Sequence, residues 1–129
     1  DQWKIMRSHV TIGEEIISDM RAKIQATTGL SLLSTALEII SGHHEKYDGS
    51  GYPRGLSASA IPLGGRIVAL ADVFDALSSR RPYKDAFPID KTLDIIRRGV
   101  GSHFDPMVFA AFEESLETLL EVYEEYKEV

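Results

Sequence analysis

Apolar residues recur mostly at helical spacing along this chain, and no stretch shows the apolar–polar alternation of a half-buried strand. The pattern therefore predicts an all-α fold. Near the N-terminus it predicts a short helix over residues 1–7, capped by Asp1, and a second helix over residues 9–25. Gly29 predicts a break, because glycine commonly follows the last turn of a helix.

The middle of the chain combines a helix with a long loop. An apolar stripe predicts a helix over residues 31–41. Residues 48–65 are rich in Gly, Ser and Pro, so they predict a loop, with one short helical turn over residues 57–61.

Residues 66–79 carry apolar side chains on nearly every side of the predicted helix, which is typical of a core helix. Only Asp72 and Asp75 interrupt it, one turn apart. A buried carboxylate without a partner is strongly unfavourable, so we expect a metal, an arginine or backbone donors to hold Asp72. A structural ion pair with Arg66 or Arg54 explains the position equally well.

Two further helices are predicted in the C-terminal part. Proline favours the first turn of a helix and glycine the position after its end, so Pro88 and Gly99 bound a helix over residues 88–98. Asp105 and Pro106 open the last helix as its cap and first-turn residue, and that helix ends in acidic residues.

Two adjacent histidines, His43 and His44, close the predicted helix over residues 31–41 and begin the run HHEKYDGSGYP. Neutral imidazole is a good ligand for iron, manganese, nickel and zinc, so the pair is a candidate metal site. The alternative is that one histidine caps the helix C-terminus and the other is solvated. Glu45 adds little to this choice, because surface carboxylates are common. His9 is either a third ligand or a polar residue of a helix face.

Imidazoles and a carboxylate together make a mixed nitrogen and oxygen ligand set, here His9, His43, His44 and Asp72. Such a set can leave coordination positions open for water. A bound cation lowers the pKa of that water and polarises a phosphoryl oxygen, which suits hydrolysis.

A basic cluster of Arg80, Arg81 and Lys84 directly follows the predicted helix over residues 66–79. Such a cluster can hold phosphate oxygens, although alone it reads as ordinary surface charge. Tyr52 lies on a Gly-Tyr-Pro turn, where it could stack on a base, bond a phosphate or pack as a turn aromatic.

Composition bounds these interpretations. The chain has 129 residues, 43% of them hydrophobic, and no cysteine, which suits one domain over residues 1–129 and excludes cysteine-ligated zinc. A net charge of -6 argues against binding to a nucleic acid polymer. Because no apolar run is long enough to span a bilayer and no signal peptide is evident, we expect a cytoplasmic location and no membrane contact by this segment.

Several segments resemble the HD-GYP family, a branch of the HD phosphohydrolase superfamily. The run HHEKYDGSGYPRGL is similar to the signature loop of that family nearly residue for residue. The runs RIVALADVFDALSSRRPYK and GSHFDP resemble its second and third blocks, and QWKIMRSHVTIG resembles the segment that carries a ligand histidine. The resemblance spans most of the chain, apart from residues 21–31 and the acidic tail.

This resemblance implies an all-α, HD-domain-like helical bundle with a long GYP loop. It implies a phosphodiesterase that hydrolyses cyclic di-GMP to linear pGpG and GMP in bacterial two-component signalling, with two or three metals, commonly iron or manganese. No catalytic side chain is implied beyond a metal-bound hydroxide that attacks phosphorus. The implied metal ligands are His9, His43, His44 and Asp72. The implied substrate-binding residues are Tyr52, Arg81 and Lys84.

One feature of the family is missing, because the sequence contains no His-Asp dipeptide. In the family that doublet lies upstream of the segment matching residues 1–13, together with further ligands. We therefore expect the chain to be the C-terminal major part of an N-terminally truncated domain. Four ligands hold at most one metal well, so the chain itself is expected to bind metal weakly and to hydrolyse little or nothing.

Two alternatives remain open. The chain can be a catalytically degenerate HD-GYP signalling or scaffold module that contacts other signalling domains or a second copy of itself. Its last helix would then dock through Leu116, Leu119, Leu120 and Tyr123. It can also be an HD-type hydrolase with another substrate, such as a nucleotide or a ppGpp-like phosphate, although the GYP loop favours a cyclic dinucleotide.

Overall fold

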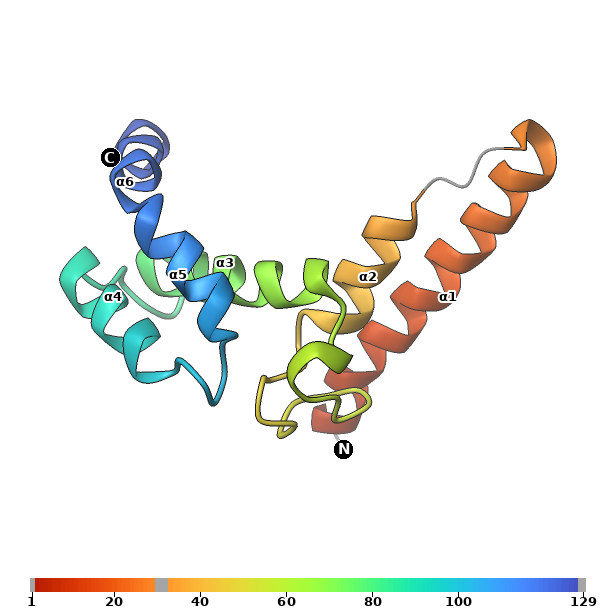
Figure 1. The fold of residues 1–129 in the computed structure, drawn as a ribbon, viewed down its shortest axis with the longest axis horizontal. Helices are drawn as coiled ribbons and strands as arrows, with labels where there is room; N and C mark the ends of the chain where they lie inside the picture. The colour runs from red at the N-terminus through yellow and green to blue at the C-terminus, as the bar shows by residue number, and fades with distance from the viewer. Residues whose placement is uncertain (1, 30–32, 128–129) are drawn as a thin grey trace. The chain divides into compact units, whose positions relative to one another are not determined.

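The computed structural model describes residues 2–29 and 33–127. Within that part of the chain the regular structure is six α-helices and one short 3-10 helix, with only isolated bridges of β type (Figure 1). The all-α prediction is confirmed. The chain divides into two compact units, residues 1–69 and 70–129, which we describe separately. The single-domain assignment stays a prediction.

The first unit begins with α1, Gln2–Thr28, the long helix drawn in red and orange in Figure 1. It is one continuous helix, so the prediction of two helices separated near residue 8 is wrong. The physical reason is that Ser8 satisfies its hydroxyl within the helix, donating to the carbonyl oxygen of Ile5 at 2.6 Å. The predicted stop is confirmed, because Gly29 has φ +73° directly after the last helical residue. The predicted cap, Asp1, lies outside the described residues.

Helix α2, Ser34–Gly42, packs against α1 and approaches it closely at Gly13. A Cβ atom on Gly13 of α1 would lie 3.1 Å from Cγ2 of Ile40. The helix starts later than predicted, and residues 31 and 32 of the predicted helix lie outside the described residues. Its end at Gly42 brings the histidine pair to the start of the long loop.

The loop after α2 contains the predicted helical turn, the 3-10 helix η1, Ala58–Ala60. Helix α3, Leu63–Ser78, then begins two residues before the predicted loop end. Its Gly65 lies against α2 so closely that a Cβ atom there would be 2.7 Å from Cα of Gly42. This approach fixes where the loop returns to α2.

The boundary between the two units falls inside α3, which explains its pattern of apolar residues. Ala69, in the first unit, and Leu70, in the second, are both buried. The helix contributes different apolar side chains to two units in succession, so it is apolar on all sides without being buried on all sides. Asp72 and Asp75 are both exposed. The prediction of an interior aspartate is therefore wrong.

The second unit packs α4, Ile89–Arg98, and α5, Pro106–Glu114, around a small core. Leu70, Ile96 and Phe104 form that core, with partly buried aromatic and valine side chains around it. Asp105 caps α5 as predicted, since its Oδ1 accepts from the backbone N–H of Met107 at 2.7 Å.

The last predicted helix is divided in two, because α5 ends at Glu114 and α6, Leu116–Tyr126, follows. The N–H of Ser115 donates to the carbonyl oxygens of Ala111 and Phe112 at 3.1 and 3.2 Å, which closes the first helix before the second begins. In the part of the chain that the structure describes, no helix has the length and apolar character needed to cross a membrane.

Candidate metal centre

The histidine pair lies where α2 ends and the long loop begins. His43 is the C-cap residue, and its backbone N–H donates to the carbonyl oxygen of Ile39 at 3.0 Å. Its ring Nδ1 lies 2.8 Å from the same oxygen. The rings of His43 and His44 are neighbours, with centroids 4.0 Å apart. Both side chains are half-buried.

Helix α1 brings His9 to the same place, although it is 35 residues from His44 in the sequence. The Nε2 atoms of His9 and His44 lie 3.2 Å apart. Ligand atoms of His9, His43 and His44 all lie within 4.8 Å of one another. The structure therefore brings together the three histidines that the sequence predicted as ligands.

The spacing of the His9 and His44 nitrogens fits a common metal ion. Two imidazole nitrogens bound to one ion at about 2.1 Å lie roughly 3.0–3.4 Å apart for octahedral or tetrahedral coordination. The observed 3.2 Å falls in that range.

Hydrogen bonds of the rings also fit a ligand role. Nδ1 of His9 contacts the carbonyl oxygen of Met6, and Nδ1 of His43 contacts that of Ile39. A carbonyl oxygen only accepts, so each Nδ1 carries the hydrogen, and in the neutral ring Nε2 then keeps the lone pair that a metal needs. Donation from the second ring nitrogen to a carbonyl is the usual way that metal-binding histidines are oriented.

Tyr52 covers the histidine cluster on one side. Its ring stacks on His44 with centroids 4.9 Å apart and planes 14° apart. The guanidinium carbon of Arg7 lies 5.1 Å from the Tyr52 ring centroid, and Trp3 approaches edge-on at 5.9 Å. The packing alternative for Tyr52 thus has direct support, while its contact with substrate stays a prediction.

The turn that carries Tyr52 is fixed at two points. Asp48 Oδ1 accepts from the backbone N–H and the hydroxyl of Ser50 at 2.9 and 2.6 Å. These bonds, the hydroxyl first, hold the pKa of Asp48 below its ordinary value. Gly51 lies against the backbone of residues 44–46, where any Cβ atom would collide with main-chain atoms. The backbone N–H of Tyr52 then donates to the carbonyl oxygen of His44 at 3.1 Å.

Sequence reasoning missed Glu45, which it treated as a surface carboxylate. The residue is only 1% exposed. Its Oε1 and Oε2 accept from the backbone N–H groups of Arg54 and Leu56 at 2.7 and 3.1 Å. Its sequence neighbours gave no signal of this burial, because the N–H groups that make it possible belong to residues beyond the turn.

Arg54 and Glu14 were missed as a pair. The two guanidinium nitrogens of Arg54 donate to the two carboxylate oxygens of Glu14 at 2.6 and 2.7 Å. This bidentate bond to Glu14 is the main reason that the pKa of Arg54 is raised. Arg66, the other expected partner of an aspartate, donates from Nε to the carbonyl oxygen of Ile61 at 2.9 Å.

The remaining predicted site residues belong to the second unit. Asp72 is exposed, and its role as a fourth ligand stays a prediction. Arg81 pairs with Asp75 at 3.2 Å. Lys84 donates to the carbonyl oxygens of Asp85 and Leu77 at 2.9 and 3.4 Å. The phosphate-binding roles of both cations stay predictions.

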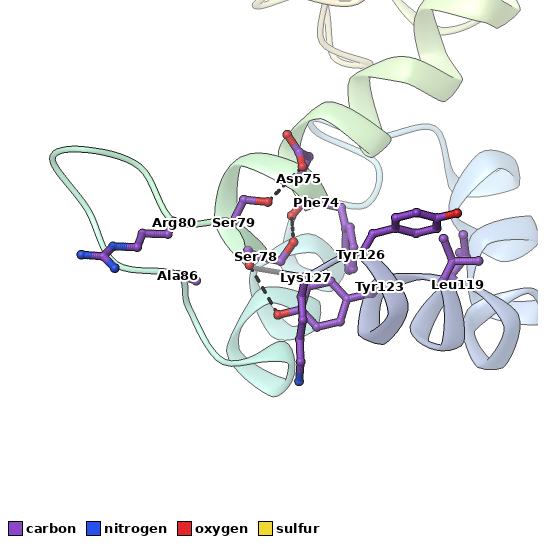
Figure 2. Close-up of a pocket in the computed structure, with 11 residues that line it drawn as sticks. Phe74, Asp75, Ser78, Ser79, Arg80, Ala86, Leu119, Tyr123, Tyr126 and Lys127 are labelled. Carbon is purple, nitrogen blue, oxygen red and sulfur yellow. Dashed lines mark hydrogen bonds between the residues drawn. The ribbon is translucent and has the colours of Figure 1, made fainter. Parts of the chain in front are cut away.

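The second unit has a pocket of about 500 Å³ between the end of α3 and α6 (Figure 2). Its apolar side is formed by Phe74, Leu119 and Tyr123, and the Tyr123 hydroxyl donates to the carbonyl oxygen of Ser78 at 3.5 Å. Asp72, Arg81 and Lys84 are not among the residues that line it. Leu119 and Tyr123, expected to dock on a partner, thus line a pocket of their own unit.

Comparison with known proteins identifies the family of the chain. The family model described as "HD domain" matches residues 1–108. A Vibrio cholerae protein named "Probable cyclic di-GMP phosphodiesterase" is 47% identical over 112 residues, which cover 87% of this chain and 25% of that protein. A Thermotoga maritima protein named "Cyclic di-GMP phosphodiesterase" is 40% identical over 128 residues, covering 99% of this chain and 33% of that protein.

A solved structure is similar as well. A crystal structure of a cyclic GMP-AMP-specific phosphodiesterase of Vibrio cholerae matches with a TM-score of 0.57 and 26% identity, over 79% of this chain and 23% of that chain. The chain spans between 22% and 33% of the length of the first three curated relatives. It belongs to the HD domain family, in the HD-GYP branch that its signature loop predicted.

Proposed function

We propose that this chain is part of a metal-dependent phosphodiesterase that hydrolyses cyclic di-GMP to linear pGpG and GMP in bacterial signalling. The observation that carries the proposal is the convergence of His9, His43 and His44, whose ligand atoms lie within 4.8 Å of one another. The names of the relatives support the substrate class, since they describe phosphodiesterases of cyclic di-GMP or cyclic GMP-AMP.

The three histidines would hold the metal through their ring nitrogens, and Asp72 is the proposed fourth ligand. Iron or manganese is the proposed metal, because imidazole and carboxylate suit both ions. When bound, such a cation lowers the pKa of water and polarises a phosphoryl oxygen. The protein's own part is to keep each Nε2 lone pair directed into the cluster, which the carbonyl contacts of His9 and His43 support.

Substrate recognition requires cations for two phosphate groups and surfaces for two bases. Arg81 and Lys84 are the proposed phosphate contacts of the second unit. In the first unit, Lys4 and Arg7 line a depression of about 390 Å³ together with Trp3. This combination of cations with an exposed indole suits an anionic nucleotide, because bases stack on aromatic faces and phosphates pair with basic groups.

Turnover tests the proposal. The full-length protein is assayed on cyclic di-GMP and on cyclic GMP-AMP with manganese or iron(II), as wild type and as His43→Ala. We expect His43→Ala to lose most of its bound metal and most of its turnover of the cyclic dinucleotide. His103→Ala is the matched control, because the ring of His103 belongs to the second unit and stacks on Phe104 with centroids 4.2 Å apart. Equal turnover by wild type and His43→Ala would overturn the metal role.

A non-catalytic binding module is the second candidate. The observation that favours it is an apolar stripe on α1, where Ile5, Ile12 and Ile16 are 71%, 53% and 55% exposed. Exposed apolar stripes commonly mark protein contacts. Metal analysis of the full-length protein separates the two candidates, since a stoichiometric redox metal supports the enzyme and its absence supports the binding module.

A further inference from the structure

A buried carboxylate follows the histidine pair directly in the sequence. Glu45 is 1% exposed. Both of its carboxylate oxygens accept hydrogen bonds from backbone N–H groups after the turn, at Arg54 and Leu56. Burying a charged group is unfavourable unless its hydrogen bonds are made, so this carboxylate holds residues 54–56 firmly beside His44.

The side chain of Arg54 continues the connection to α1. Its guanidinium forms a bidentate bond with Glu14, a residue only 9% exposed on the helix that carries His9. Arg54 is thus held at its backbone by Glu45 and at its side chain by Glu14. We call Glu14, Arg54 and Glu45 the clamp.

The clamp connects two segments that must stay in register for a metal to bind. His9 belongs to α1, whereas His43 and His44 lie at the start of the loop. The 3.2 Å separation of the His9 and His44 nitrogens depends on how the loop lies against α1. A shift of about 1 Å between them would take the pair outside the range that one ion spans.

We propose that the clamp is a positioning device that holds His9 at metal-binding distance from His43 and His44 and thereby sets the affinity of the site for its cation. The inference rests on the proposed three-histidine metal site and adds residues that do not touch the metal. Their effect is indirect, because they hold the segments that carry the ligands; removing residues that orient metal ligands typically lowers metal affinity by about 10–100-fold.

A positioning role and a purely electrostatic role of the clamp predict opposite changes in metal affinity for one substitution. The clamp contains two carboxylates and one guanidinium. Arg54→Gln removes the positive charge, so a purely electrostatic role predicts tighter binding of a cation. A positioning role predicts weaker binding, because Gln cannot make the bidentate bond to Glu14. The sign of the change separates the two.

The experiment titrates cobalt(II) into the full-length protein and records calorimetric heat and the visible absorption of the ion. We expect Arg54→Gln to lower the affinity about tenfold or more and to change the cobalt spectrum, and Arg54→Lys to lie between it and wild type. Lys23→Gln is the matched control. This substitution breaks the exposed ion pair between Lys23 and Asp19, 2.8 Å long, on α1, the helix that also carries Glu14. It should leave the affinity for cobalt(II) unchanged.

The outcomes distinguish this inference from the proposed function. If wild type and His43→Ala bind cobalt(II) equally, the metal site itself is wrong. If His43→Ala abolishes binding while Arg54→Gln binds equally well or more tightly, the metal site stands and the clamp inference is overturned. Circular dichroism verifies that each variant is folded. Should Arg54→Gln unfold, Arg54→Lys decides, and an affinity equal to wild type would count against positioning.

Discussion

The rings of Tyr52 and His44 are stacked, with centroids 4.9 Å apart and planes 14° apart. The same two residues are joined by a backbone hydrogen bond from the N–H of Tyr52 to the carbonyl oxygen of His44. The signature tyrosine of the loop therefore supports a candidate metal ligand at both its side chain and its main chain. This contact turns the open question about Tyr52 into a measurable one.

We predict that Tyr52→Phe binds cobalt(II) within about threefold of wild type and that Tyr52→Ala binds about tenfold more weakly. Phenylalanine keeps the stacked ring that orients His44, whereas alanine removes it, and such aromatic pairs contribute about 0.5–1.5 kcal/mol. Cobalt(II) titration of the full-length protein measures both. If the hydroxyl instead bonds a substrate phosphate, Tyr52→Phe of the full-length protein keeps its metal but loses kcat/KM.

The signature residues were predictable because their chemistry is local in the sequence. The two adjacent histidines alone left a metal site and a helix-capping role both open, as His9 left a ligand role and a polar surface role open, and the resemblance favoured the metal site for all three. Glu45 was not predictable from its neighbours, because the N–H groups of Arg54 and Leu56 that make its burial possible come after the turn. Its burial is a property of the closed loop.

The predicted helix boundaries were wrong where packing or a local hydrogen bond determined where a helix ends. Residues near Ser8 were read as a boundary, although the helix absorbs the hydroxyl through a bond to Ile5. Asp72 was read as interior because its helix is apolar on all sides. Since that helix supplies Ala69 to one unit and Leu70 to another, hydrophobic periodicity could not reveal which side remains exposed.

Gly65 allows α2 and α3 to approach each other, which leads to a stability prediction. In Gly65→Ala the new Cβ atom would lie 2.7 Å from Cα of Gly42, so the two backbones must separate. We expect a loss of about 1–3 kcal/mol, typical of overpacking, despite the higher helix propensity of alanine. Thermal unfolding followed by circular dichroism measures the loss.

Gly64→Ala is the control for that measurement. The neighbouring glycine would place its Cβ atom 3.3 Å from a side-chain atom of Ile39, which can rotate away. We expect its melting temperature to equal or exceed that of wild type. Equal destabilisation by the two variants would show that helix contact at Gly65 is not the cause.

The Asp48–Ser50 turn gives a pH prediction. Hydrogen bonds from Ser50, its hydroxyl first, lower the pKa of Asp48 from the ordinary value of 3.8. A lowered folded-state pKa means that the stabilisation is fully present above that ordinary value and is lost as the pH falls through the lowered one. NMR titration of the Asp48 carboxyl carbon should therefore give a midpoint below 3.8.

Ser50→Gly removes the hydroxyl and should move the Asp48 midpoint back toward its ordinary value. The stability difference from wild type should be present at neutral pH and vanish at the acid end of the titration. Ser57→Ala, which changes another serine of the same loop, should leave the midpoint in place. A Ser50→Gly midpoint unchanged from wild type would mean that the hydroxyl does not hold this carboxylate.

Arg81 and its neighbour Arg80 offer a test of substrate binding in the full-length protein. Arg81 pairs with Asp75 at 3.2 Å, with side chains that are 39% and 66% exposed, whereas Arg80 lines the pocket in Figure 2. We predict that Arg81→Ala lowers kcat/KM for a cyclic dinucleotide about 10–100-fold, because hydrogen bonds to charged groups contribute about 1.5–3 kcal/mol. Arg80→Ala should leave kcat/KM unchanged. Stability should change by less than about 1 kcal/mol, since exposed ion pairs contribute little.

Asp75→Asn should change substrate binding in the opposite direction to Arg81→Ala. Arg81 donates to the Asp75 carboxylate in the structure, so a substrate phosphate that binds Arg81 would compete with that carboxylate. Removing that negative charge while keeping the size of the side chain should make Arg81 more available and lower KM, with kcat little changed. A raised KM would mean that Asp75 orients Arg81 for the phosphate instead of competing with it. If Arg80→Ala and Arg81→Ala lose the same activity, general charge of the loop explains the effect and the specific contact to Arg81 fails.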